Sequence, residues 1–231
     1  MRVHRFYTGE ELKLKKDFWL HDDAMLWQWN KVLRFRDGQE VILFDGLQTD
    51  RLYKIVELKK TEAHLQMVTE LDRVLPARNV YLLWSLLKRD NNEHILQKCT
   101  ELGISNFVPL ITDRTIKKEF NLERARKIVQ EAAEQCGRSN IPHVREPLHM
   151  QKALEEYKDH LILFVAHKGH KNTEKLQDGG KYGILIGPEG GWSDKEQEVF
   201  AREDYAGIDL GDFTLRAETA AVVAAAKLVQ A

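Results

Sequence analysis

The sequence predicts a two-domain α/β protein in which a small β-barrel-like module precedes a larger domain built on a parallel sheet. From residue 74 onward, short apolar runs typical of buried strands alternate with helix-like segments, the pattern of a parallel sheet covered by helices on both faces. Upstream, the chain carries alternating polar and apolar segments at hairpin spacing. The pattern changes between Asp72 and Ala77, so we expect domains at residues 1–73 and 74–231.

The N-terminal module is predicted to consist mainly of strands. Asp37-Gly38 and Asp45-Gly46 are turn signals of the kind that joins strands in hairpins. One helix, at about residues 22–33, interrupts the strand pattern. A module of roughly 70 residues is close to the lower size that folds alone. The expected strands are 39–44, 51–58 and 63–68.

The C-terminal domain is predicted to alternate between strands and helices. Gly103 and Gly137 stop its first two helices. The second of these helices carries an apolar stripe that includes Ile128, Ala132 and Cys136. The expected strands are 80–86, 107–111, 141–144, 161–165, 184–186 and 208–210, and the expected helices are 91–102, 123–136, 149–157, one capped by Ser193, and 217–231.

Composition restricts the function classes that are open to this chain. With 231 residues and 43% hydrophobic content, it is large enough for the core of a globular enzyme. No apolar stretch reaches about 18 residues and no apolar signal region follows the N-terminal charges, so a cytoplasmic protein without membrane insertion is expected. Lys plus Arg total 35 against 36 Asp plus Glu, so any RNA binding must come from local patches.

The cysteines and histidines do not indicate a disulfide or a metal site. Cys99 and Cys136 are far apart, and neither belongs to a C-x-x-C pair, so both are expected to pack within helices. His167 and His170 have no third ligand near them in the sequence and are expected to be loop residues. We therefore expect no bound metal.

Two glycine turns near the C-terminus carry the strongest indication of chemistry. The first lies in the segment 183–193 and the second in the segment 210–220, and each follows a short apolar strand and leads into a helix signal. Open α/β sheets bind ligands at the C-terminal ends of their strands, so two such turns predict one pocket. Taken alone, Gly-Pro-Glu-Gly-Gly is also an ordinary turn, and Glu189 and Glu218 are equally compatible with capping the helices that follow.

Four motifs that follow one another along the chain resemble the signature of a known family. They are Gln97 to Ile104, Glu131 to Arg138, Gly187 to Gly191 and Leu215 to Ala220. In this order they resemble the RsmE family, the 16S ribosomal RNA (uracil-N3)-methyltransferases of the SPOUT class. Val32 to Gly38 and Val41 to Gly46 are similar to the PUA-like RNA-binding module of that family.

The resemblance implies a fold and partners that the residue pattern alone does not give. It implies a SPOUT domain with a deep C-terminal trefoil knot, preceded by a small PUA-like β-barrel domain. It also implies S-adenosylmethionine as cofactor, 16S rRNA or the small ribosomal subunit as substrate, and a homodimer formed through the knot domain and the C-terminal helix. That helix is too apolar for a lone surface helix, so we expect it to be buried against a partner subunit or the knot.

By the same resemblance, the two glycine turns and the loop after residue 165 wrap the cofactor. Glycines there let a nucleoside approach main-chain groups without Cβ atoms in the way. The expected cofactor-binding residues are Ala166, His167, Ile186, Gly187, Pro188, Glu189, Gly190, Gly191, Leu210, Gly211 and Leu215.

The implied reaction needs a cation and a base, because N3 of uracil carries a weakly acidic proton. We expect Arg216 to stabilise negative charge on the uracil carbonyl oxygens, and Glu218 to act as orienter or base. Because the two residues are two apart, they are unlike an i,i+4 surface pair. Two alternatives stay open: a SPOUT enzyme that modifies another RNA nucleotide or a ribose 2'-oxygen, and a non-catalytic RNA-binding protein on the same fold.

The expected RNA contacts come from scattered arginines: Arg2, Arg5, Arg34 and Arg138. For Arg2, Arg5 and Arg34, an ordinary solvated surface charge is an equally good interpretation. For Arg138, a surface ion pair with Glu134 is an equally good interpretation. The tryptophans at 19, 27 and 29 are expected to pack in the core. The chain departs from the family pattern at Phe213, where we expect a basic residue, at Ala217 in place of Thr, and at Trp192 in place of Phe. Paired histidines expected near residues 27–30 are also missing.

Overall fold

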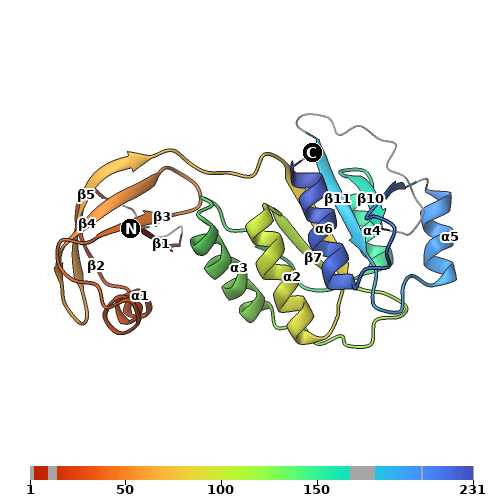
Figure 1. Ribbon diagram of the computed structural model, residues 1–231, viewed down its shortest axis with the longest axis horizontal. Helices are drawn as coiled ribbons and strands as arrows, with labels where there is room; N and C mark the ends of the chain where they lie inside the picture. Colours follow the sequence, from red (N-terminus) through yellow and green to blue (C-terminus); the bar gives the residue numbers. More distant parts are fainter. Residues whose placement is uncertain (1–2, 10–14, 167–179, 204, 231) are drawn as a thin grey trace. The chain divides into compact units, whose positions relative to one another are not determined.

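The computed structural model describes residues 3–9, 15–166, 180–203 and 205–230. Its chain divides into two compact units (Figure 1). The first comprises residues 1–75 together with 133–141, and the second comprises residues 76–132 and 142–231. The division near residue 75 lies two residues from the boundary expected from the sequence. The membership of 133–141 in the first unit has no counterpart in the sequence pattern.

The first unit is a five-stranded sheet with one helical segment. Its strands follow the order β1-β3-β4-β5-β2, in which β1 pairs with β3 in parallel and the other neighbours are antiparallel. Three of the strands match the prediction, whereas the short β1 and β2 were not expected. The strands are β1 (His4–Tyr7), β2 (Asp17–Leu20), β3 (Glu40–Phe44), β4 (Asp50–Leu58) and β5 (Ala63–Leu71).

The helical segment of the first unit changes its winding halfway. Helix α1 (Asp23–Trp27) begins at Asp22, whose side chain accepts a hydrogen bond from the Met25 amide, and continues as the π-helix η1 (Gln28–Leu33). Arg34 ends it in the left-handed conformation, with φ 54. The core prediction for the tryptophans holds for Trp29 only, since it is fully buried while Trp19 and Trp27 are 37% and 61% exposed.

The second unit is a parallel sheet with helices on both faces. Its strand order is β12-β10-β11-β6-β7-β8, with β9 also paired to β7, and all these pairs are parallel. The strands are β6 (Asn79–Ser85), β7 (Asn106–Ile111), β8 (His143–Val144), β9 (Leu148–His149), β10 (Ile162–Ala166), β11 (Lys181–Ile186) and β12 (Ala206–Ile208). The helices are α2 (Arg89–Leu102), α3 (Leu122–Cys136), α4 (Met150–Tyr157), α5 (Asp194–Arg202) and α6 (Ala217–Gln230).

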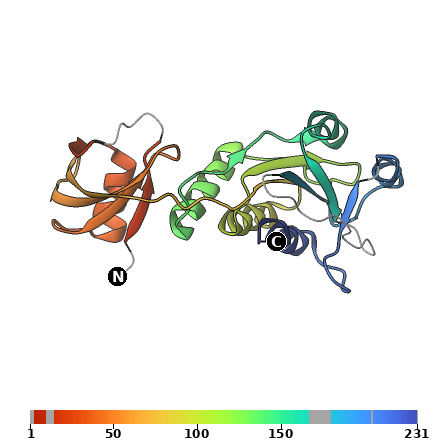
Figure 2. The ribbon, with the colours of Figure 1, turned by 90° about the horizontal axis from the view of Figure 1, so that it is seen from above.

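Both faces of this sheet are buried, as its near-continuous apolar strands predict. Helices α2 and α6 lie side by side on one face, and α4 covers the other (Figures 1 and 2). The buried stripe of α6, which includes Ala221, Ala224 and Ala225, therefore packs against its own chain, on α2, β6 and β11. Small alanine side chains allow this close approach. Within the described ranges, no helix combines the length and the apolar character that crossing a bilayer needs.

The cysteine on α2 provides a test of this packing. Cys99 is fully buried, and burial raises the pKa of its thiol far above the ordinary value. Because the thiolate is the nucleophile, we expect Cys99 of the native protein to resist alkylation at about pH 8 while the half-buried Cys136 reacts first. Mass spectrometry of iodoacetamide-treated protein, with and without denaturant, measures this difference. Alkylation of Cys99 in native protein at the rate seen in denaturant would contradict the burial.

Candidate active site

A cavity of about 960 Å³ lies at the C-terminal edge of the parallel sheet. The loops that follow β6, β7, β11 and β12 and the last residue of β10, Ala166, contribute to its wall, because parallel strands end at the same edge. Its volume falls in the range of small-molecule sites, about 300–1,000 Å³. The prediction that the two glycine turns share one pocket is confirmed, since residues of both line this cavity.

The first glycine turn is held by packing and by a helix cap. A Cβ on Gly187 would lie 3.0 Å from the Trp192 indole, so any larger residue here would press on that ring. Ser193 and Glu196 form a complete capping box at the start of α5, as the sequence predicts. The indole N–H of Trp192 is buried and has no acceptor among the described residues, which is a spare donor beside the cavity.

A loop that the sequence analysis overlooked braces this turn from the side. Glu196 is buried and accepts hydrogen bonds from the amides of Ser193 (2.7 Å) and Asp113 (3.0 Å). Arg114 donates to the carbonyl oxygen of Gly190 at 2.9 Å. The loop after β7 and the glycine turn after β11 are therefore fixed to one another by charge-assisted hydrogen bonds.

Buried hydroxyl groups fix the same loop from below. Ser85, Thr112 and Thr115 are all buried, and their three oxygens lie 2.8–2.9 Å from one another. The Thr115 hydroxyl also accepts from the Thr112 amide at 2.9 Å. Each polar group thus has a partner, as burial demands. This network anchors the chain just before Ile116 and Lys117, which line the cavity.

The second glycine turn is held by Asp209. Gly211 has φ +100, a conformation that favours glycine, and its amide donates to the Asp209 carboxylate at 2.9 Å. The Lys227 ammonium on α6 donates to the Asp209 carbonyl oxygen at 2.6 Å. The turn is therefore tied to the helix that follows it.

The two expected catalytic residues both line the cavity, at the start of α6. Arg216 is exposed and forms no ion pair within the described part of the chain. Glu218 is half-buried, and the side-chain amide of Asn91 donates to its carboxylate at 3.4 Å. A free guanidinium and an oriented carboxylate thus share one cavity, a combination suited to binding and deprotonating a weakly acidic group.

Most of the expected cofactor residues lie in the cavity wall. Those that line it are Ala166, Ile186, Gly187, Pro188, Glu189, Gly191, Leu210, Gly211 and Leu215. Gly190 is not among the lining residues, but its carbonyl oxygen accepts the hydrogen bond from Arg114. His167 lies outside the described residues. The lining residues that were missed include Lys88, Asn91, Arg114 and Lys117. They follow the C-terminal ends of β6 and β7, so the strand-end argument applied to every strand would have found them.

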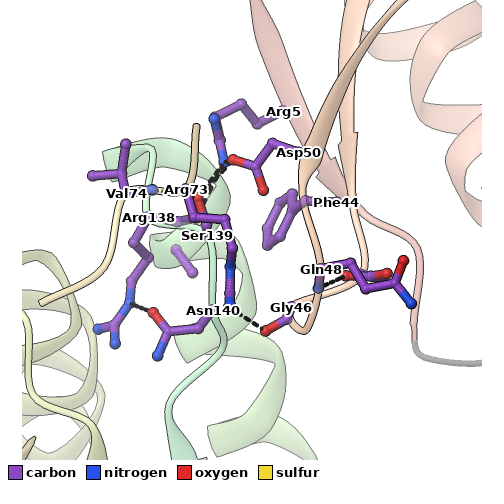
Figure 3. Close-up of polar contacts among 12 residues, drawn as sticks. Arg5, Phe44, Gly46, Gln48, Asp50, Arg73, Val74, Arg138, Ser139 and Asn140 are labelled. Carbon is purple, nitrogen blue, oxygen red and sulfur yellow. Dashed lines mark hydrogen bonds and ion pairs between the residues drawn. The ribbon is translucent and has the colours of Figure 1, made fainter. Parts of the chain in front are cut away.

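The expected RNA-contacting arginines separate into exposed and buried groups. Arg34 is exposed, and Arg2 lies outside the described residues. Within the first unit, however, Arg138 is buried and the Arg5 side chain is only 11% exposed (Figure 3). The Arg5 guanidinium pairs with Asp50 and donates to Ser139 at 3.3 Å. The surface role expected of Arg5 and Arg138 is therefore not supported by their positions.

Arg138 and Asp50 are the most enclosed charges of this cluster, at 4% and 1% exposure. Burial lowers the pKa of Arg138 to about 10, and its Nε donates to Asn140 at 3.1 Å. Ser139 Oγ donates to Asp50 at 2.6 Å and accepts from the Val74 amide at 2.8 Å. The segment 133–141 is thus held in the first unit by hydrogen bonds to buried polar groups.

Comparisons with known proteins agree on one class. A family model described as an RNA methyltransferase domain matches residues 74–229, and one described as an RNA methyltransferase PUA domain matches residues 31–68. A ribosomal RNA small subunit methyltransferase E of Synechocystis is 33% identical over 89% of this chain and 70% of its own. The enzyme of that name from Bacillus subtilis is 31% identical over 84% of this chain and 82% of its own.

Solved structures extend the likeness to the whole chain. A ribosomal RNA small subunit methyltransferase E from Neisseria gonorrhoeae, bound to S-adenosyl methionine, superposes with a TM-score of 0.88. It is 28% identical, and the match covers 98% of this chain and 97% of that one. The similarity therefore includes both units.

Proposed function

Because the chain belongs to the RsmE family of ribosomal RNA small subunit methyltransferases, we propose that it uses S-adenosylmethionine to methylate N3 of one uridine in 16S rRNA. The chain is an RNA methyltransferase by family. The observation that carries the finer proposal is the meeting of the two glycine turns with Arg216 and Glu218 in one cavity. We place this activity in the cytoplasm, where ribosomal subunits are assembled.

The cavity suits the proposed cofactor in size and in the chemistry of its wall. Its apolar residues, which include Leu86, Ile186 and Leu210, offer contacts for a nucleoside, and the main chain around Gly187 offers polar groups without a Cβ in front of them. Three acidic residues, Glu189, Asp209 and Glu218, line the same space and complement a positive charge. When bound, S-adenosylmethionine supplies an electrophilic methyl group on a sulfonium.

The side chains of this protein must then prepare the uracil. Removing the N3 proton leaves negative charge on the flanking carbonyl oxygens, which the Arg216 guanidinium, without an ion pair among the described residues, can stabilise. Glu218 is the carboxylate nearest to Arg216 in the sequence, and the Asn91 side-chain amide donates to it at 3.4 Å. We therefore assign Glu218 the role of base or orienter. The fixed loops position the methyl group and the nitrogen in line, and this positioning removes a large entropic barrier.

Two further properties that the resemblance implies remain proposals. One is a trefoil knot in the second unit, and the other is a homodimer that uses the knot domain and α6. The partly exposed apolar residues Val222, Val223 and Ala226 support the second proposal, since they remain after α6 has packed on its own sheet. Light scattering of the purified protein measures the oligomeric state directly.

Nucleoside mass spectrometry of 16S rRNA from a deletion strain is the experiment that tests the reaction. We expect 3-methyluridine to disappear in the deletion strain and to return when the intact gene is restored. Retention of 3-methyluridine would contradict the assignment, and loss of a different methylated nucleoside would instead indicate another nucleotide or a ribose 2'-oxygen as target.

Isothermal titration of the purified protein with S-adenosylmethionine distinguishes an enzyme from a non-catalytic RNA-binding protein on this fold. We expect saturable binding at micromolar to millimolar ligand, the range typical of enzyme substrates. The absence of heat from binding at millimolar ligand would favour the non-catalytic alternative.

A further inference from the structure

Methylation at N3 places a demand on the cavity that the proposed cofactor and Arg216 do not meet. N3 lies on the pairing edge of uracil, and enzymes that act on a base take it out of its stack and hold it against aromatic or apolar side chains. Unstacking the base costs free energy, and stacking on a protein side chain offsets this cost. If the proposed function is correct, such a side chain is needed at the cavity.

Only two aromatic residues line the cavity in the described part of the chain, Trp192 and Phe213. Trp192 is 4% exposed, packs edge-on against Phe200 with ring centroids 4.9 Å apart, and fits closely against Gly187. Its ring faces are therefore not available to a base. Phe213 is 85% exposed and makes no ring contact with any described residue.

The position of Phe213 in the chain places it close to the reacting groups. It lies two residues after Gly211 and three before Arg216, in a loop that Asp209 ties to α6. Single exposed apolar residues are common on protein surfaces, but this one stands on an anchored loop in the wall of the cavity that contains Arg216. Because the loop backbone is anchored, stacking on this ring costs mainly the rotamer freedom of the Phe213 side chain.

We infer that Phe213 is the positioning residue on which the extruded uracil stacks, while Arg216 reaches the carbonyl oxygens of the same base. Aromatic rings stack on any nucleobase, so this contact supplies affinity and orientation, and the cation supplies recognition. A basic residue at this place would instead bind phosphate, and its contribution would fall with rising salt. The phenylalanine contribution should therefore depend only weakly on salt.

Steady-state kinetics of Phe213 variants with 16S rRNA or small subunits test this inference. We expect Phe213→Ala to raise the KM for RNA about tenfold, with the Kd for S-adenosylmethionine unchanged, and the increase to be similar at low and high salt. Phe213→Tyr should keep the KM within about twofold of wild type, and Phe213→Leu should fall between, since it keeps apolar area without an aromatic face.

Ile116 provides a matched control for these variants. It is also 85% exposed and lines the same cavity, but it has no aromatic face. Ile116→Ala should raise the KM for RNA less than Phe213→Ala does, because it removes apolar area without removing a stacking face. An equal increase in KM for Ile116→Ala and Phe213→Ala would overturn the stacking role in favour of general apolar contact.

A substrate change gives a second, independent measurement. RNA with an abasic site at the target uridine should bind wild type at least as weakly as intact RNA binds Phe213→Ala, because it also loses the Arg216 contact, and adding Phe213→Ala should weaken binding of the abasic RNA no further. Additive losses would overturn the proposal, as would a shift in oligomeric state of Phe213→Ala, which would assign the ring to a second copy of this chain. Failure of wild type to methylate rRNA would refute the proposed function instead, whereas active wild type with an unaltered Phe213→Ala would refute only the stacking.

Discussion

Replacing Arg216 with alanine is expected to lower the rate of uridine methylation by about a hundred- to a thousandfold while leaving the affinity for S-adenosylmethionine nearly unchanged. Arg216 is exposed in the cavity and forms no ion pair with the described residues, so its charge is free to meet the charge that develops on the uracil. Among the described residues, its side chain makes no hydrogen bond to either glycine turn. Its removal should therefore disturb the chemistry and leave the cofactor loops in place.

Arg114→Ala is the matched control, because Arg114 lines the same cavity but donates to the Gly190 carbonyl oxygen. Titration with S-adenosylmethionine should show reduced cofactor affinity in Arg114→Ala, whereas single-turnover measurements should show the larger loss of rate in Arg216→Ala. Arg216→Lys should recover part of the rate, since it keeps the charge without the planar fork. An equal loss of rate and cofactor affinity in Arg216→Ala would move this residue from catalysis to cofactor binding.

Replacing Asp50 with alanine is expected to lower the free energy of unfolding of the first unit by about 3–5 kcal/mol. Asp50 is 1% exposed, pairs with Arg5 and accepts from Ser139 Oγ at 2.6 Å. Its loss leaves the guanidinium of Arg5, which is 11% exposed, without its partner in the interior. Urea unfolding followed by hydrogen exchange of the β1 and β3 amides measures the change in that unit.

Glu70→Ala removes the acidic partner of another arginine in the same unit and serves as the control. Glu70 Oε1 lies 3.2 Å from Arg51, but its side chain is 52% exposed, so water screens the pair. We expect a change of about 0–1 kcal/mol for this variant. Equal effects of the two substitutions would show that burial of the Asp50 carboxylate adds nothing to stability.

The parts of the site that could be predicted from the sequence are those whose signals lie close together along the chain. A strand, a glycine turn and a helix signal follow one another within about ten residues in both turns, so the pocket at Gly187 and Gly211 could be located without any long-range contact. The brace from Asp113 and Arg114 could not, because it joins loops some 80 residues apart in sequence.

The arginines show a different limit of sequence reasoning. Arg5, Arg34 and Arg138 are chemically alike, and near-neutral composition gives no preference for one environment over another. Only the pairing of Arg5 with Asp50 separates it from the exposed Arg34. The strands β1 and β2 were missed for a related reason, since runs of four residues are too short to show a period.

The assignment of residues 133–141 to the first unit means that the chain crosses between its two units three times, after residues 75, 132 and 141. The first unit is therefore not one continuous segment of the chain that ends after its last strand. A fragment cut at residue 75 would lack Ser139 and expose the Asp50 carboxylate that this residue covers. A single exchange of sequence at residue 75 would therefore separate Asp50 from its partner Ser139 and leave the first unit incomplete.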